Sequence, residues 1–191
     1  MLEKLLEWDR DTLIYLNGLG VEPYDGFWTS VTNIATWIPL FILFLVLLFW
    51  KFPRKVALLK FYMVLGLAFF ITAATHLCKI TVARLRPNNS EDINGLIRVL
   101  KTPTDYSFFS GHASSSLAIT MLMYLFLRRK VFWAPLFFIW PLLFSYSRIY
   151  VGVHYPVDIL VGAVVGILSA ILFYFLYQRF IAPYSGLSHP E

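Results

Sequence analysis

Two of the four histidines have neighbours in the sequence that suit nucleophilic and acid–base chemistry. His154 is followed four residues later by Asp158, and this spacing brings a carboxylate within reach across one helical turn. Such a carboxylate fixes the tautomer of the imidazole and directs the other ring nitrogen at a substrate, which suits a nucleophile. His112 has no carboxylate within sequence reach and follows Ser110 and Gly111 at a predicted helix start. It is better placed as the acid that protonates a leaving oxygen.

Three basic residues could hold an anion beside these histidines. Lys79 and Arg86 are seven residues apart and so lie near one helical face, and Arg148 ends a later apolar run. Guanidinium groups bind phosphate oxygens in pairs. Backbone N–H groups at Gly111 and His112 would add the anion-binding amides of a helix N-terminus. The residue types therefore predict a phosphate site and the hydrolysis of a phosphate ester.

Each of these signals also has an ordinary structural interpretation. A basic side chain at a membrane-helix end commonly extends to lipid head groups. A serine before a helix is commonly a cap, and an acid in the first turn complements the helix dipole. An interfacial histidine can make a single incidental hydrogen bond. No one signal is specific, so the phosphate-site prediction depends on their occurring together.

The elements that must position these residues are membrane-spanning helices. Of the 191 residues, 59% are hydrophobic and only 14% are charged, whereas a soluble domain has about 25% charged residues. The composition therefore excludes a soluble globular protein. Five stretches lack Asp, Glu, Lys and Arg, and each is close to the length that crosses a bilayer as a helix. They are Gly26–Trp50, Phe61–Cys78, Tyr106–Leu127, Val131–Ser147 and Ile159–Gln178.

We predict an all-α integral membrane protein with one domain, residues 1–191. Five transmembrane helices near 33–51, 58–80, 110–128, 131–148 and 157–178 form the bundle. Residues 1–20 mix leucines with charged side chains, are too charged to span, and are predicted to form an amphipathic helix on the membrane surface. This makes six helices in total, and a mobile amino-terminal tail is the alternative. Gly162, Gly166 and Ala170 predict a close helix–helix contact.

The distribution of loop charges predicts the orientation. Residues 51–60, 128–130 and Arg179 place eight basic residues on one side, together with the single acid Glu191. The other side carries eight basic and ten acidic residues. By the positive-inside rule the amino terminus and the loops 84–106 and 147–158 face outward, and the carboxyl terminus lies inside. The net charge of +5 is therefore a topology signal and does not indicate nucleic acid binding.

Three motifs together resemble those of a known family. Lys79 and Arg86-Pro87 form the first, Phe109-Ser110-Gly111-His112 the second, and Ser147-Arg148, His154 and Asp158 the third. Their order, spacing and placement between spans are similar to the signature motifs of the type-2 phosphatidic acid phosphatase superfamily. The match covers Lys79 to Asp158. Phe109 departs from the proline common in the family, and we expect it to alter the turn and leave the catalytic atoms in place.

The resemblance implies a metal-independent phosphatase without a cofactor that passes through a phosphohistidine. His154 would attack phosphorus, Asp158 would orient it, and His112 would protonate the leaving group and then act as base on water. The residues implied to hold phosphate oxygens are Lys79, Arg86, Ser110, Gly111 and Arg148. Arg84 lies outside the motif and is interpreted as a lipid head-group contact.

The membrane setting favours a phosphorylated lipid as substrate. The chain is most similar to the small bacterial undecaprenyl diphosphate phosphatases, which implies the bacterial cytoplasmic (inner) membrane with the active site on the periplasmic or outer face. Phosphatidylglycerophosphate, phosphatidate and lipid A phosphatases share the motifs and remain alternatives. The vanadium haloperoxidases of the superfamily are soluble and are excluded by the composition. A non-catalytic anionic-lipid-binding or transport protein is the alternative from another class.

Overall fold

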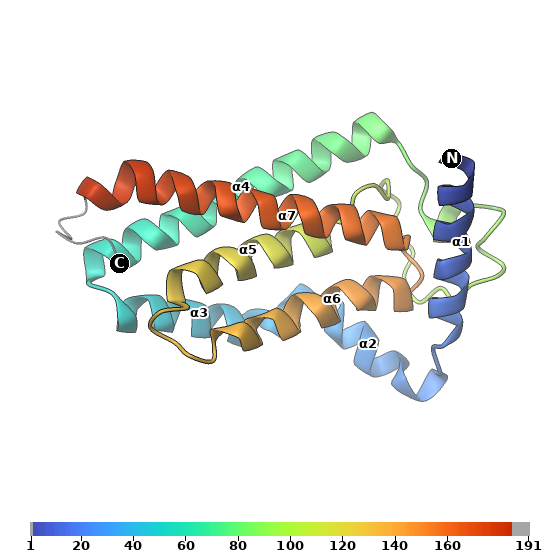
Figure 1. Ribbon diagram of the computed structural model, residues 1–191. Coiled ribbons are helices and arrows are strands. Elements are labelled where there is room, and N and C mark those ends of the chain that lie inside the picture. Colours follow the sequence, from blue (N-terminus) through green and yellow to red (C-terminus); the bar gives the residue numbers. More distant parts are fainter. Residues whose placement is uncertain (1, 185–191) are drawn as a thin grey trace.

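The uncharged stretches of the sequence form helices in the computed structural model, which describes residues 2–184 (Figure 1). Met1 and residues 185–191, including the Glu191 of the charge count, lie outside the described residues. Within residues 2–184 there is no strand. The α-helices are α1 (Leu2–Gly18), α2 (Asp25–Val31), α3 (Ile38–Lys51), α4 (Arg54–Val82), α5 (Gly111–Leu127), α6 (Ile139–Tyr150) and α7 (Pro156–Leu176). Short 3-10 turns are Glu22–Tyr24, Ile34–Trp37, Pro87–Asn89, Ala134–Phe138 and Ala182–Tyr184, and a π-helical segment is Tyr177–Ile181.

Helices α3 to α7 overlap the five stretches predicted to span the membrane, and the count of five spans stays a prediction. Three segments are long and apolar enough to cross a membrane, namely Ile34–Lys51, Arg54–Asn89 and Pro156–Tyr184, and α5 is apolar but shorter. The described residues form seven α-helices, one more than the six predicted, because α2 is separate from the first span. Asn33 causes this break, since its side chain accepts a hydrogen bond from Ala35 N (3.1 Å) and starts a new helical turn there.

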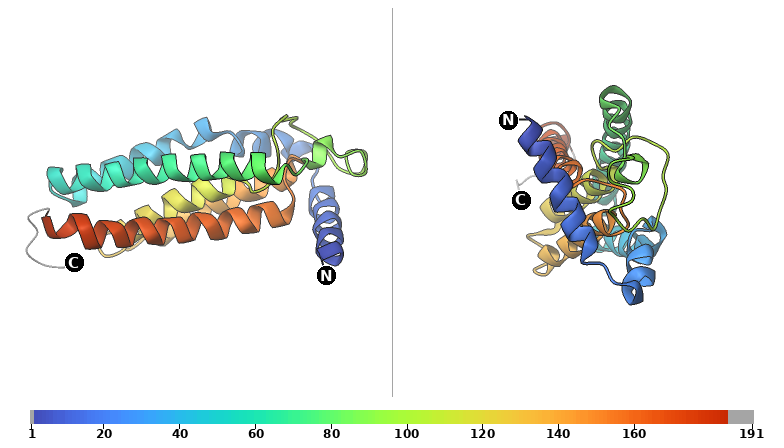
Figure 2. Two further views of the ribbon diagram at one scale, coloured as in Figure 1. Left: turned by 90° about the horizontal axis from the view of Figure 1, so that it is seen from above. Right: turned by 90° about the vertical axis from the view of Figure 1, so that its right-hand side faces the viewer.

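Helix α1 lies across one end of the bundle (Figure 2). Its buried face consists of Asp9, Leu13 and Asn17, four residues apart, while Leu5 and Trp8 are about half exposed. The helix predicted for residues 1–20 is therefore present, and it turns a largely polar stripe toward the protein. That its exposed apolar side chains enter the membrane surface stays a prediction.

The side chain of Asn17 binds the end of α1 to backbone groups of the bundle. The Asn17 amide nitrogen donates to three backbone carbonyls at 3.0 to 3.1 Å, and its oxygen accepts from a backbone N–H at 2.7 Å. These backbone groups belong to Arg98, Ile149 and Tyr150. Because a buried amide is stable only when its donors and acceptor are satisfied, α1 is a docked element and the mobile-tail alternative is wrong.

Helices α5 and α7 pack with their backbones in close contact. A Cβ added at Gly162 would lie 2.7 Å from the carbonyl oxygen of Ser110, and one at Gly166 would lie 2.3 Å from that of Ser114. Only glycine permits this approach, so the predicted small-residue contact is confirmed. It brings the start of α5 beside the start of α7.

The two ends of the bundle differ in character. The α4–α5 loop (residues 83–110), the turn between α6 and α7, and α1 all lie at one end (Figure 1). The basic turns around Lys51 and Arg128 lie at the other end, beside the far end of α7. Between the ends, large apolar side chains such as Phe69 and Leu168 are exposed. An exposed apolar belt of this kind is expected where lipid surrounds the protein.

Candidate active site

His154 lies in the tight turn that joins α6 to α7. Gly152 in this turn has φ of +77°, and a Cβ there would come within 2.5 Å of the carbonyl oxygen of Arg98. The position thus requires glycine for both conformation and space. The turn is closed by a hydrogen bond from Val153 N to Arg148 O (3.1 Å). It places the His154 ring inside the protein, with 1% of the residue exposed.

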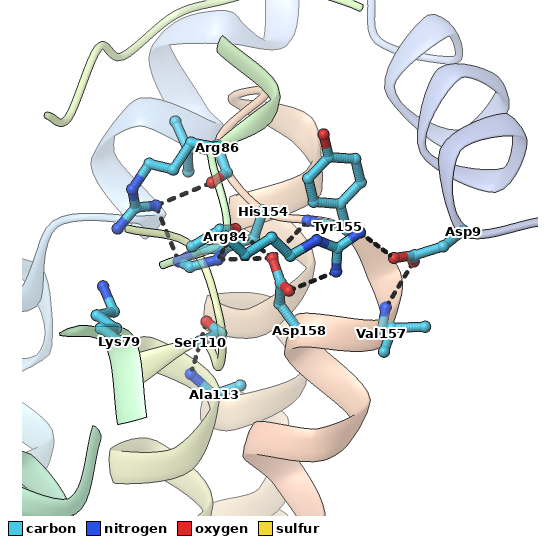
Figure 3. A network of polar contacts seen from close by, with 12 residues as sticks. Asp9, Lys79, Arg84, Arg86, Ser110, Ala113, His154, Tyr155, Val157 and Asp158 are labelled. Atoms are coloured by element: carbon cyan, nitrogen blue, oxygen red, sulfur yellow. Dashed lines mark hydrogen bonds and ion pairs between the residues drawn. The ribbon is translucent and has the colours of Figure 1, made fainter. Parts of the chain in front are cut away.

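The hydrogen bonds of His154 define its tautomer (Figure 3). A terminal nitrogen of Arg86 lies 3.0 Å from Nε2. Because arginine can only donate, Nε2 must be the accepting nitrogen and the ring proton must be on Nδ1. Nδ1 lies 3.3 Å from Oδ2 of Asp158 and 3.3 Å from the Ser107 hydroxyl. The geometry therefore produces a neutral imidazole with the lone pair of Nε2 facing the cation cluster.

The electrostatic surroundings keep His154 uncharged. Burial lowers the pKa of the ring well below 6.5, and the positive charges of Arg86, Arg148 and Lys79 lower it further. The opposing attraction of a nearby carboxylate is smaller. A neutral histidine is the form that can act as a nucleophile.

Asp158 is buried and satisfied at both carboxylate oxygens. Oδ2 accepts from the backbone N–H of Tyr155 (3.0 Å) and from the Ser107 hydroxyl, in addition to His154. Oδ1 accepts from Arg84 at 2.8 Å. Asp158 therefore caps α7, as expected of an acid in the first turn of a helix. It contacts His154 at the same time.

Lys79 and Arg86 converge on a carboxylate of the α4–α5 loop. Arg86 donates to Oδ1 of Asp105 through two nitrogens at 2.8 and 3.2 Å, and Lys79 pairs with Oδ2. Burial alone would raise the pKa of Asp105, but the hydrogen bond from Lys79 and the charge of Arg86 outweigh it and lower that pKa. Asp105 is thus ionised and occupies the two cations that are predicted to hold phosphate.

His112 and Arg148 line a cavity of about 420 Å³ next to this network. Arg148 is buried, donates to the Thr32 hydroxyl, and has a buried Nε without a hydrogen-bond partner among residues 2–184. It lies within electrostatic range of Arg86 and Asp105. The cavity is also lined by side chains that the sequence did not single out, namely Thr32, Asn33, Ile34, Lys101, Ser115 and Phe144.

Ser110 and Gly111 form the start of α5, between the His154–Asp158 pair and the cavity that His112 and Arg148 line. The Ser110 hydroxyl accepts from Ala113 N (3.4 Å), so it makes the capping contact of the ordinary interpretation. Ser110 N donates to the carbonyl oxygen of Asp158 (3.0 Å), which ties the second motif to the third. A Cβ at Gly111 would meet Thr75 at 3.3 Å. Phe109, in the position where the family commonly has proline, is buried and leaves this cap in place.

The structure also assigns contacts that sequence reasoning missed or misread. Arg84 binds Asp158 and Asp9 and lies over the Tyr155 ring, so its interpretation as a lipid head-group contact is wrong. Its position two residues before Arg86, in a segment that is not helical, was the available signal, since residues two apart in an extended segment share one side. Ser107 was counted within an apolar stretch. Nothing in the sequence distinguished Asp9.

A buried histidine–aspartate pair among cations, at one end of an apolar helical bundle, defines a membrane phosphoryl-transfer protein. The sequence profile of the PAP2 superfamily matches residues 57–182, more than half of the chain. The chain belongs to the PAP2 superfamily and is a phosphatase of lipids.

The relatives that carry this assignment have different substrates in their names. A lipid A 4'-phosphatase of Bacteroides thetaiotaomicron is 32% identical over 190 residues, which cover 95% of this chain and 82% of the relative. An undecaprenyl-diphosphatase of Sulfolobus acidocaldarius is 35% identical over 168 residues, which cover 86% and 71%. A crystal structure of a phosphatidylglycerolphosphate phosphatase from Bacillus subtilis has the same fold, with a TM-score of 0.73, 19% identity, and 93% and 88% of the chains covered.

Proposed function

We propose that the protein hydrolyses a lipid phosphate through a phosphohistidine on His154. The observation that carries this proposal is the contact of Nε2 with Arg86, because it leaves the nucleophilic lone pair on the nitrogen that faces the cations. Arg86 must turn from Nε2 to the phosphate oxygens when substrate binds. Nε2 then forms a bond to phosphorus, and the bond from phosphorus to the leaving oxygen breaks.

In its protonated form, His112 supplies the proton that the leaving oxygen needs and becomes the neutral imidazole that serves as base in the second step. Its ring lines the cavity with Arg148, so a lipid oxygen held there is close to an acid and to a cation. In the second step a water molecule loses a proton to His112 and attacks phosphorus, and the N–P bond breaks. Lys79, Arg86, Arg148, Ser110 and Gly111 hold the phosphate oxygens in both steps.

The arrangement in the membrane follows from the two different ends of the bundle. Five helices cross the bilayer, α1 lies in the outer interface, and the site opens to the periplasmic or outer face of a bacterial cytoplasmic membrane. Support comes from the basic residues at the end opposite the site and from the exposed apolar side chains of α1.

Lipid A carrying a 4'-phosphate is the favoured substrate. The match to the lipid A 4'-phosphatase covers 95% of the chain, so it extends well beyond residues 57–182 into the amino-terminal third that supplies Thr32 and Asn33 to the cavity wall. Their polar side chains can bind sugar hydroxyl groups. Undecaprenyl diphosphate, which the sequence favours, is the second candidate, because Lys101 in the same wall can bind a second phosphate.

A competition assay tests both parts of the proposal. Purified protein in detergent with EDTA is offered lipid A, undecaprenyl diphosphate, phosphatidylglycerophosphate and phosphatidate, and kcat/KM is compared, since specificity is that ratio. We expect lipid A to be hydrolysed fastest. A higher kcat/KM for undecaprenyl diphosphate would make the second candidate correct.

The His154→Ala variant is the control for chemistry. This variant should bind lipid and release no phosphate. Wild-type enzyme that is mixed with phosphate-labelled lipid and quenched at alkaline pH should carry the labelled phosphate on histidine. Phosphate release by His154→Ala at the wild-type rate would refute the nucleophile. Lipid binding without hydrolysis by the wild-type protein would favour a binding or transport role.

A further inference from the structure

Arg84 joins two buried carboxylates that come from opposite ends of the sequence. One of its terminal nitrogens donates to Oδ1 of Asp158 at 2.8 Å, and the other donates to Oδ2 of Asp9 at 2.7 Å (Figure 3). Its guanidinium carbon lies 3.8 Å from the ring centroid of Tyr155. The planar guanidinium is therefore held by two carboxylates at its edge and an aromatic ring on its face, which leaves it little freedom to rotate.

Asp9 makes a second contact that ties α1 to the catalytic turn. Its Oδ1 accepts from the backbone N–H of Val157 at 2.8 Å, in the first turn of α7. This N–H is one of the donors at a helix start that no helical carbonyl can satisfy. Asp9 is fully buried. One carboxylate of the amino-terminal helix thus holds both the start of α7 and the arginine that contacts Asp158.

The contact with Arg84 determines how the Asp158 carboxylate can turn. Oδ2 is occupied by His154, Ser107 and the Tyr155 amide, and Oδ1 is fully buried with Arg84 as its ion-pair partner. Without the guanidinium, Oδ1 would be left with an uncompensated buried charge. The carboxylate would then rotate or take up a proton, and either change would weaken its hold on Nδ1 of His154.

We propose that Arg84, held in place by Asp9 of α1, is a positioning residue for phosphoryl transfer to His154. This inference rests on the proposed function of His154. The residue acts through Asp158, so its loss should slow the formation of phosphohistidine while lipid binding is retained. The docked amino-terminal helix is then a part of the catalytic apparatus, although it contributes no group that touches the substrate.

The test compares Arg84→Ala, Arg84→Lys, Asp9→Ala and Asp9→Asn with the wild type in detergent. We expect kcat to fall about 10- to 100-fold in Arg84→Ala, the range found when the residue that orients a metal-binding histidine is removed, with KM within about threefold. Asp9→Ala should show a smaller fall in kcat, and Asp9→Asn a smaller one still, because the amide oxygen can accept from Val157. Arg84→Lys should have a higher kcat than Arg84→Ala. Added guanidinium ion should restore a part of the lost kcat of Arg84→Ala.

Arg98→Ala provides the matched control. Arg98 also forms an ion pair at this end of the bundle, with Asp25 at 2.7 Å, and none of the contacts described above joins it to Asp158. It should therefore lower the unfolding temperature without the selective loss of kcat. Equal losses of kcat in Arg84→Ala and Arg98→Ala, with no response to guanidinium, would show a structural role only and overturn the proposal.

The result also separates this inference from the proposed function. Full kcat in Arg84→Ala, with His154→Ala inactive, would refute the positioning role and leave the nucleophile in place. Activity in His154→Ala would refute the nucleophile itself. If Arg84→Ala does not fold, kcat of the isosteric Asp9→Asn variant and of Asp9→Ala tests the proposal instead. A wild-type kcat in both variants would refute the coupling of α1 to catalysis.

Discussion

At the scale of single residues, the cations of the site act on the histidine as well as on the phosphate. Arg86, Arg148 and Lys79 lower the pKa of His154 in the free enzyme and so keep it neutral for attack. A bound phosphate would neutralise the same cations, and the pKa of His154 would then rise. This change favours the positively charged ring that exists once phosphorus is bonded to Nε2.

His154 should therefore be neutral at pH 6.5, where an ordinary histidine is about half protonated. In ¹⁵N NMR of histidine-labelled protein in detergent, we expect its ring to carry one proton, on Nδ1, at pH 6.5, because its pKa lies well below that value. Addition of vanadate should move the midpoint upward. The His154→Gln variant assigns the signal. A midpoint at or above pH 6.5 without ligand would contradict the prediction.

Asp105 should compete with phosphate for the two cations. Replacement by Asn removes the charge that Lys79 and Arg86 now share, and we expect inorganic phosphate and vanadate to inhibit about three- to tenfold more strongly. The gain is limited because the carboxylate is 55% exposed and partly screened by water. Inhibition constants at fixed salt measure the effect.

Asp92→Asn supplies the charge control for this variant, because Asp92 is an exposed acid of the same loop. It should leave inhibition unchanged. If Asp105→Asn weakened inhibition instead, Asp105 would be a support that holds Arg86 in position.

At the scale of elements, the contact of α5 with α7 aligns two of the three motifs. Ser110 N binds the carbonyl oxygen of Asp158, and its own carbonyl oxygen lies against Gly162 one turn further along α7. The start of α5 with His112 and the start of α7 with Asp158 are therefore held at a separation that only a glycine at position 162 allows.

Gly162→Ala should disturb both stability and catalysis. Its Cβ would lie 2.7 Å from a backbone oxygen that has no room to move away, and overpacking of this kind costs about 1–3 kcal/mol. Gly66→Ala on α4 is the control, because its Cβ would meet only Phe173, at 3.6 Å. Thermal unfolding in detergent and kcat measure the two effects. Equal unfolding temperatures for the two variants would show that α5 and α7 can separate at little cost.

At the scale of the whole molecule, the two ends of the bundle carry different sets of charged residues. At the end that carries the site, Asp9, Asp105 and Asp158 form ion pairs with arginines, and the other end has basic turns. By the positive-inside rule we expect the end with the basic turns to face the cytoplasm. A lipid phosphate on the outer leaflet would then meet the site from the side of α1.

Labelling of single cysteines tests this orientation. In a Cys78→Ser background, which removes the one native cysteine, we expect Glu91→Cys to react with an impermeant maleimide in intact spheroplasts. Arg129→Cys should react only after lysis. Activity of each variant shows that the fold is retained. The opposite labelling pattern would place the site in the cytoplasm.

The sequence by itself determined the features that depend on neighbours along the chain. Apolar stretches long enough to cross a bilayer determine the helices, because unpaired backbone groups in lipid are costly. His154 and Asp158 are four residues apart, with His154 just before α7 and Asp158 in its first turn, so the capped start of the helix brings them together wherever α7 lies. Gly162 and Gly166 likewise share one face of one helix.

Only the tertiary structure decided which distant side chains complete the site. Asp105 reaches Lys79 across 26 residues, Arg84 reaches Asp158 across 74 and Asp9 across 75, and Arg148 reaches Thr32 across 116. Such pairs form because helix packing buries a charge and a buried charge must find a partner. Which partner it finds depends on the packing of whole helices, and spacing along the sequence carries no record of that.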